Sequence, residues 1–261
     1  MRNWSSTAKF WPAIGLLLLL GIWEAGVRLF ALPGWLLPPP SSVITSLCNN
    51  FFLIADHSAY TLLEAAIGYA VSVLLAVFLA LTFALSPLIK KLLYPLLILS
   101  QTIPLITLAV LFTIWFGWGL LPKVLVVVLV CFFPIALSLM NAISNVDFDL
   151  ISLFKSMGAR PLTIFRMVEL PLAMPGLFSG LRISATYSIM AAVIAEWMGA
   201  QHGLGYYMIL QQKSFAIDRV LAAVLVICLL SLLMVKLVDM LEYLFIPWNR
   251  EQVRPDYQPL N

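Results

Sequence analysis

Charged side chains are scarce in this chain of 261 residues. Asp, Glu, Lys and Arg make up 10% of the sequence, whereas hydrophobic residues make up 62% and the mean hydropathy is +1.02. So few polar groups cannot cover the surface of a soluble globule of this size. The composition therefore excludes a soluble domain and predicts an all-α protein with several membrane spans.

Cysteines and clustered basic residues are also scarce. The three cysteines are an odd set, and Cys131 and Cys228 fall inside apolar runs. This placement disfavours a disulfide framework, so we expect the thiols to pack as small apolar groups. The longest run of basic residues is the pair Lys90-Lys91, so the net charge of +3 gives no indication of nucleic-acid binding.

Motifs for catalysis and nucleotide binding are absent as well. The chain has no G-x-x-x-x-G-K-[ST] loop with which to cradle ATP phosphates. It has no H-E-x-x-H motif, and its two histidines, His57 and His202, suggest no Ser/His/Asp arrangement. We therefore expect no catalytic residues, no metal site and no cofactor bound by this chain.

Long stretches without charge mark the membrane spans, because a helix needs about 20 residues to cross roughly 30 Å of hydrocarbon. The first stretch could also belong to a signal peptide, since Arg2 and Lys9 precede it. We interpret it as an uncleaved span, because no small-x-small cleavage site follows promptly and Glu24 and Arg28 have the spacing of a helical ion pair. The six expected spans are 12–32, 60–86, 94–117, 121–144, 173–198 and 219–246, within one transmembrane domain of residues 1–261.

Lysine and arginine in the loops predict the orientation. With the amino terminus inside, nine of them lie on the inner face and four on the outer face. Positive charge accumulates in cytoplasmic loops, so we expect both termini in the cytoplasm. The inner set is Arg2, Lys9, Lys90, Lys91, Lys155, Arg160, Arg166, Arg250 and Arg254, and the outer set is Arg28, Lys123, Lys213 and Arg219.

The segment 33–58 is expected to lie on the outer surface. Pro38-Pro39-Pro40 stops a helix there, and Ser41 is a plausible cap for the next one. Apolar residues then recur at helical spacing, which predicts a short helix along the membrane surface. These residues are Val43, Ile44, Leu47, Phe51 and Ile54.

Proline and small residues inside the spans indicate a kinked, closely packed bundle. Pro104, Pro134 and Pro175 free backbone groups, which membrane proteins tolerate beside protein or a water-filled cavity. The kinks favour a pathway through the bundle, with simple tolerance of proline as the alternative. Small residues every four positions in the fifth span allow close helix packing, either within one chain or between two. They are Gly176, Gly180, Ser184, Ser188 and Ala192.

Three polar residues are candidates for lining a solute pathway. Glu64 and Glu196 lie in the outer halves of spans two and five, where ionisable groups usually face a cavity or a partner. Gln101 immediately precedes the break at Pro104. The alternative for the two acids is a position at the lipid headgroups or pairing with a cation such as Arg219.

A polar island interrupts the apolar sequence between spans four and five. Six charged residues occur in positions 147–169, whereas positions 124–146 contain none. The stretch from Phe148 to Met157 predicts a short amphipathic helix that ends at Gly158. An apolar face exposed to water is costly unless a partner covers it. The candidate contact residues in this segment, 147–171, are Leu150, Leu153, Phe154, Met157, Gly158, Ala159 and Arg160.

This island resembles the cytoplasmic signature of permease subunits in binding-protein-dependent ABC importers. Gly158, Val168 and Leu170-Pro171 match its glycine, aliphatic and Leu-Pro positions in register, whereas Ser152-Leu153-Phe154 replaces its acidic-Ala-Ala triplet. Further fragments look like the nitrate/sulfonate/taurine-type family of permeases. They are Leu37-Pro38-Pro39-Pro40-Ser41-Ser42-Val43, Ile103-Pro104, Trp115-Phe116-Gly117, Phe133-Pro134-Ile135, Gly180-Leu181-Arg182, residues 195–200 and residues 203–206.

The resemblance implies a type I ABC importer permease fold with a cytoplasmic coupling helix in segment 147–171, in the bacterial cytoplasmic (inner) membrane. It also implies a homodimer, two ABC ATPase subunits that bind ATP and Mg²⁺, and an extracytoplasmic substrate-binding protein. The contact residues of the island would then couple to the ATPase. A departure at the triplet affects the detailed contacts, because the apolar face and Gly158 remain.

The solute is predicted from charge and from one further likeness. Two acids facing one pathway would repel an anion. Thr61–Ala65 together with Ser156–Ala159 looks most like the branch of the family associated with pyrimidine precursors of thiamine. We therefore expect an aminopyrimidine-type solute, with sulfonate, taurine or nitrate as the alternative. Other classes are a passive channel or the transmembrane subunit of an energy-coupling vitamin importer, although the latter should show two Ala-Arg-Gly motifs.

Overall fold

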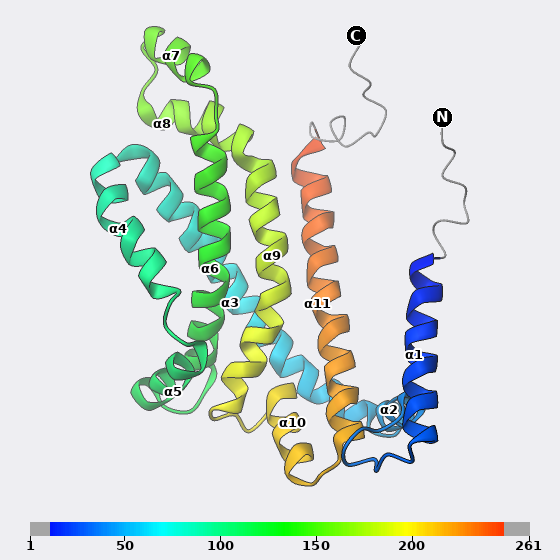
Figure 1. Ribbon diagram of the computed structural model, residues 1–261. Coiled ribbons are helices and arrows are strands. Elements are labelled where there is room, and N and C mark those ends of the chain that lie inside the picture. Colours follow the sequence, from blue (N-terminus) through cyan, green and yellow to red (C-terminus); the bar gives the residue numbers. More distant parts are fainter. Residues whose placement is uncertain (1–10, 248–261) are drawn as a thin grey trace, which may run out of the picture.

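Long helices running side by side form the body of the molecule (Figure 1). The computed structural model describes residues 11–247, and these form helices joined by turns, with no strand among them. Four stretches of helix there are long and apolar enough to cross a membrane, and a bent pair adds a fifth candidate. The expectation of an all-α membrane protein is confirmed. The four are α3 (Phe51–Leu85), α6 (Leu120–Ser144), the stretch Pro161–Trp197 that contains α9 (Leu170–Trp197), and α11 (Ile217–Phe245).

The expected span 94–117 is a bent pair of helices instead of one straight helix. α4 (Pro87–Ser100) and α5 (Leu105–Phe116) meet at an angle of 98°. Pro104 has no N–H to donate and precedes the first turn of α5, while the Thr102 hydroxyl donates to the Leu99 carbonyl and helps to close α4. The sequence signalled the break but not the size of the bend.

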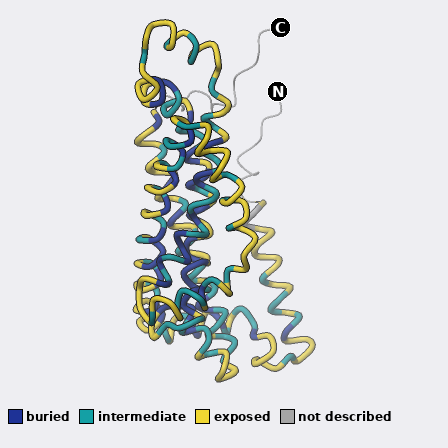
Figure 2. Tube along the Cα trace, turned by 90° about the vertical axis from the view of Figure 1, so that its left-hand side faces the viewer, coloured by how far each residue is buried: buried dark blue, intermediate teal, exposed yellow. Residues whose placement is uncertain are grey.

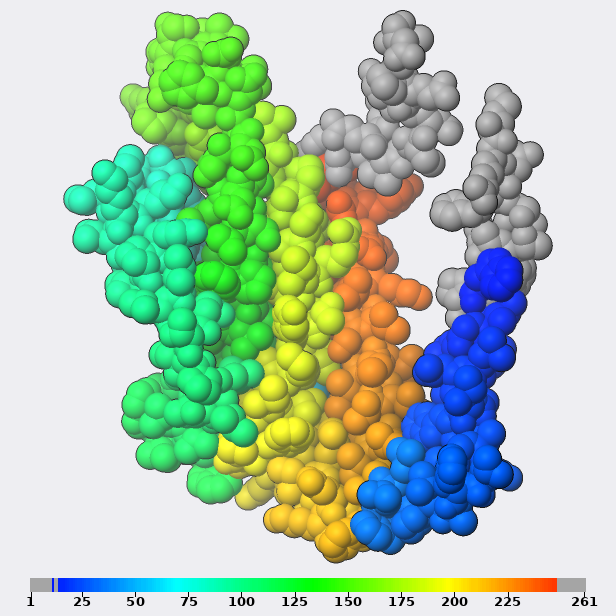
Figure 3. Space-filling model, viewed as in Figure 1, coloured from blue at the N-terminus to red at the C-terminus, as the bar shows by residue number. Residues whose placement is uncertain are grey.

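The expected first span corresponds to α1 (Trp11–Leu29), which stands apart from the bundle. It meets the rest of the molecule near α2 (Pro40–Asn49), and a gap separates it from α11 further along (Figure 3). The expected ion pair of Glu24 with Arg28 is present, at 2.6 Å. Ser41 lies inside α2 instead of capping it, and its hydroxyl donates to Glu24 at 2.8 Å.

α3 begins earlier than the expected span 60–86, because Phe51 and Ile54 belong to it and not to the surface helix. Arg2, Lys9, Arg250 and Arg254, on which part of the orientation argument rests, lie outside the described residues. Short helices complete the two ends of the bundle. We name these ends after α7 (Phe148–Ser156) and α10 (Leu204–Lys213), and α8 (Pro161–Ile164) lies at the α7 end (Figure 1).

The core of the bundle is the contact of α9 with α6, and the small residues of α9 make it possible. A side chain added at Gly180 would place its Cβ 2.7 Å from that of Ser138 on α6. The Ser184 hydroxyl donates to the Cys131 carbonyl across the same contact, at 2.8 Å. Buried residues follow this seam along the bundle (Figure 2). The small-residue stripe therefore packs within one chain.

A charged cluster joins α9 to α11. Arg182 of α9 forms ion pairs with Asp239, at 2.7 Å, and with Glu242. The two acids are three residues apart and therefore lie on one face of α11. In a membrane span such charges are costly unless they are paired, so this cluster fixes the two helices relative to each other.

We expect Gly180→Ala to destabilise the contact of α9 with α6 by about 1–3 kcal/mol, because the added methyl group must displace Ser138. The midpoint of thermal unfolding of the purified protein in detergent measures this. Gly21→Ala in α1 is the matched control, since a Cβ at Gly21 meets nothing within 4 Å. Alanine is favoured there by roughly 1 kcal/mol of helix propensity. Equal midpoints for the two variants would contradict the close approach.

Candidate functional site

At the α10 end, a buried carboxylate holds the loop between α9 and α10. Glu196 is 1% exposed, at the last turn of α9. Its Oε1 atom accepts a hydrogen bond from the Thr61 hydroxyl of α3, at 2.7 Å, and its Oε2 atom accepts one from the Gly205 N–H, at 2.5 Å. A buried carboxylate needs such donors, because burying a charge without partners is very costly.

Two further side chains of α3 complete this arrangement. The Thr61 oxygen accepts from the Leu204 N–H at 2.8 Å, and His57 Nδ1 accepts from the Gly203 N–H at 3.1 Å. The first N–H groups of α10, which have no partner inside the helix, are thereby satisfied. Gly203 has a φ of +109°, and any side chain there would overlap the Glu196 carboxyl group. Only glycine therefore fits this position.

A second buried carboxylate lies beside the first. Glu64 Oε1 is 2.5 Å from the Lys123 Nζ atom of α6, and the two side chains are 4% and 12% exposed. Glu64 Oε2 is buried and has no hydrogen-bond partner among the described residues. The Glu64 and Glu196 carboxyl groups also interact electrostatically. Two acids and one base thus share a site of low polarity, where charge interactions are strong.

A pocket of about 390 Å³ opens beside this ion pair. The rings of Tyr60 and His202 stack in its wall, with centroids 4.6 Å apart. Trp118 is 74% exposed and packs on Gly199 in the loop after α9. The polar and aromatic lining residues are Tyr60, Glu64, Trp118, Lys123, Gln201 and His202.

The structure brings Glu64 and Glu196 together but places Gln101 elsewhere. Gln101 lies at the bend between α4 and α5, in a separate hollow of about 320 Å³. Arg219, the cation considered for the two acids, donates to Gln211 at 3.3 Å. The cation that pairs with Glu64 is Lys123, and this pair was not predicted from the sequence.

His57 and Thr61, the other polar residues around the two acids, were not predicted from the sequence either. His57, Thr61 and Glu64 follow one another at intervals of four and three residues, so they lie on one face of α3. A row of polar residues on one face of an apolar helix is a usable signal, and it could have identified this site. No such sequence pattern indicated Trp118 or the stacked pair of Tyr60 and His202.

A different surface lies at the other end of the bundle. α7 begins where the Asp147 carboxylate accepts from the Asp149 N–H at 2.9 Å, and it ends before Gly158, whose φ is +78°. The expected short helix is therefore present. Gly158, Ala159 and Arg160 form the turn into α8.

The expected contact residues in and after α7 are exposed, except for Phe154 and Ala159. Met157 is 74% exposed and Leu153 54%, whereas Phe154 is half-buried. Leu150, Leu153 and Met157 lie on one side of the helix and form an exposed apolar face, which we call the α7 face, whereas the exposed Phe148 lies on the opposite side.

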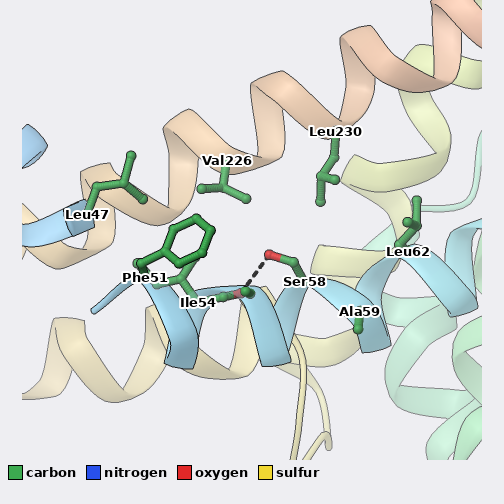
Figure 4. A pocket seen from close by; sticks show the side chains of 9 residues that line it. Leu47, Phe51, Ile54, Ser58, Ala59, Leu62, Val226 and Leu230 are labelled. Carbon is green, nitrogen blue, oxygen red and sulfur yellow. Dashed lines mark hydrogen bonds between the residues drawn. The ribbon is translucent and has the colours of Figure 1, made fainter. Parts of the chain in front are cut away.

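Another hollow among the described residues has few polar atoms with which to bind a solute. This apolar hollow, of about 310 Å³, lies between α3 and α11, where one hydroxyl, that of Ser58, is already bonded to the Ile54 carbonyl (Figure 4). No group of three or more His, Cys, Asp or Glu side chains in residues 11–247 could hold a metal ion. The three cysteines form no disulfide there.

Comparisons with known proteins agree with this geometry. Residues 72–250 match the model of the binding-protein-dependent transport system inner membrane components. The chain is 33% identical to the formylaminopyrimidine transport permease protein ThiX of Halalkalibacterium halodurans, over 92% of this chain and 96% of ThiX. It is 29% identical to the taurine transport system permease protein TauC of Escherichia coli, over 95% of this chain and 94% of TauC. An amino acid ABC transporter of known structure shares the fold, with a TM-score of 0.60 and 18% identity over 78% of this chain and 97% of that chain.

We expect Thr61→Val to loosen the loop between α9 and α10. The change leaves the Leu204 N–H without its acceptor and the Glu196 Oε1 atom without its donor, and each buried unsatisfied group costs about 1–3 kcal/mol. The measurements are the thermal midpoint and the rate of protease cleavage within residues 198–203. Thr186→Val is the control, because Thr186 is exposed and bonds within its own helix. A loop no more sensitive than in that control would contradict the role of Thr61.

Proposed function

Because the chain belongs to the family of binding-protein-dependent transport system inner membrane components, we propose that two copies of it form the pathway of an ATP-driven importer. The chain itself is a permease subunit of an ABC importer. In the proposed assembly, two ATPase subunits supply the energy and bind ATP and Mg²⁺. A binding protein delivers the solute from outside.

The observation that carries the proposed assembly is the α7 face. Three apolar side chains exposed on one face at the end of a bundle need a partner, because an uncovered apolar surface in water is costly. Gly158 ends the helix at the position that the signature of such permeases requires. We therefore assign the α7 face to contact with the ATPase, and the α7 end to the cytoplasm.

The α10 end is then the outer end, where solute arrives. Glu64 and Lys123 line its pocket as an ion pair, and the buried Glu196 carboxyl group beside Glu64 adds a negative charge when it is ionised, which favours a solute that is not an anion. The similarity to ThiX, whose name specifies a formylaminopyrimidine, favours the same class. We propose an aminopyrimidine-type solute for this permease.

A sulfonate such as taurine is the second candidate, because TauC is similar over nearly the same length. The energy-coupling vitamin importer and the passive channel have no comparable support. The family match covers the segment that contains both α7 and the loop at the α10 end.

Uptake by the reconstituted importer tests the solute class. The complex of permease, ATPase and cognate binding protein in vesicles should import a labelled aminopyrimidine only with ATP, and at least about tenfold faster than taurine. That ratio corresponds to roughly 1.4 kcal/mol of discrimination. Passive equilibration without ATP would contradict the importer, and faster uptake of taurine would contradict the aminopyrimidine.

Charge introduced on the α7 face tests the assignment of the ATPase contact. We expect Leu153→Asp combined with Met157→Asp to leave the permease inserted but to abolish co-purification of the ATPase, because two charges would be buried in an apolar contact. Phe215→Asp is the matched control, since Phe215 is 69% exposed at the opposite end. If the ATPase still co-purifies with the double variant and uptake persists, the α7 face is not the contact.

A further inference from the structure

The pocket at the α10 end has the size and the walls of a small-molecule site. Its volume of about 390 Å³ lies within the range of roughly 300–1,000 Å³ that ligand pockets occupy. It combines aromatic side chains with a few polar groups, which is the usual composition of such sites. It lies between the neighbouring ends of α3 and α6 and the loop after α9.

The aromatic side chains favour a flat ligand. Tyr60 and His202 already stack on each other, and the Trp118 indole is 74% exposed beside the same pocket. A tryptophan so exposed leaves a ring face without a partner. Aromatic heterocycles stack well on such faces, whereas a tetrahedral sulfonate does not.

The polar groups favour a ligand that both donates and accepts hydrogen bonds. Lys123 can only donate, and Glu64 when ionised can only accept. The buried Glu64 Oε2 atom has the Glu196 carboxyl group as its neighbour, so a ligand would meet the Glu64–Lys123 pair from the pocket side. An exocyclic amino group next to a ring nitrogen presents a donor and an acceptor side by side, which matches this pair. Sulfonate and nitrate present acceptors alone, so Glu64 would oppose them.

We infer that this pocket is the entry site of the permease for the solute, with Trp118 stacking on an aminopyrimidine-type ring and the Glu64–Lys123 pair recognising its amino group and ring nitrogen. The inference rests on the proposed function for the class of solute. It adds a binding site on this chain, separate from the solute's site on the delivering protein. It also makes Trp118 a specificity-determining residue, because its side chain is largely exposed beside the pocket while part of its ring packs on Gly199.

Protection of a cysteine from labelling tests the site directly. Gln201→Cys places a thiol in the pocket wall, and Gln212→Cys places one at the end of α10 outside it. The native Cys48 and Cys228 are exposed, so both are replaced by alanine in the background used. The complex of permease and ATPase is exposed to a charged maleimide, with and without a formylaminopyrimidine. We expect the solute to slow labelling at position 201 and to leave position 212 unaffected.

Substitution of Trp118 connects this protection to stacking. Trp118→Ala should raise the solute concentration for half-maximal protection about tenfold, since one stacking face is lost. Trp118→Phe should restore most of the affinity. Trp35→Ala is the matched control, because Trp35 is 58% exposed and does not line the pocket. Glu64→Gln preserves shape and keeps an acceptor for Lys123, and it should weaken protection more than a loss of folded protein, measured in the same sample, accounts for.

The outcomes separate this site from the proposed solute class. If the wild-type complex imports the aminopyrimidine but position 201 is not protected, or Trp118→Ala behaves like Trp35→Ala, the pocket is not the site and the proposed solute stands. If taurine is imported and protects position 201 while the aminopyrimidine does neither, both conclusions are overturned. Protection by the aminopyrimidine with the expected dependence on Trp118 supports the site even where uptake is absent.

Discussion

The hydrogen bonds of the Glu196 carboxylate determine the structure of the α10 end. A bundle in lipid must satisfy every backbone N–H and C=O group from within. Helix α9 ends at Trp197, and the chain turns back into α10 at Leu204, so the first N–H groups of α10 need acceptors. Glu196 and Thr61 supply them. Because Thr61 belongs to α3, the same bonds fix the loop to the bundle and define one wall of the pocket.

The Glu64–Lys123 pair depends on this arrangement. Two carboxylates placed so close would repel each other if Lys123 were absent. Lys123 comes from the first turn of α6, and α6 is held in position by its long contact with the small residues of α9. The close packing of α6 against α9 therefore sets the distances between the charged side chains of Glu64, Glu196 and Lys123.

Local patterns in the sequence predicted the parts of the fold that depend on neighbours along the chain. Apolar length identified the spans, a glycine marked the end of α7, and a spacing of four residues identified the pair of Glu24 with Arg28. The contact of Glu196 with Thr61 was beyond this reasoning, because Thr61 is 135 positions away in the sequence. The bend of 98° between α4 and α5 was also beyond it, since Pro104 allows a break without fixing its angle.

Helix α9 connects the two functional ends of the chain. Its 28 residues extend over about 42 Å, from the segment that follows α8 to Glu196 beside the pocket. Between α8 and α9, residues Phe165–Glu169 form a π-helix, a wider turn that commonly accompanies functional positions in helices. The seam with α6 and the ion pairs of Arg182 with α11 oppose independent bending of α9. In the proposed assembly, a displacement of α7 and α8 by an ATPase would be carried along α9 as a rigid body, with the adjustment concentrated at the π-helix. The hydrogen bonds of Glu196 would make the loop beside the pocket move with α9, and this would couple the α7 end to the shape of the proposed site at the α10 end.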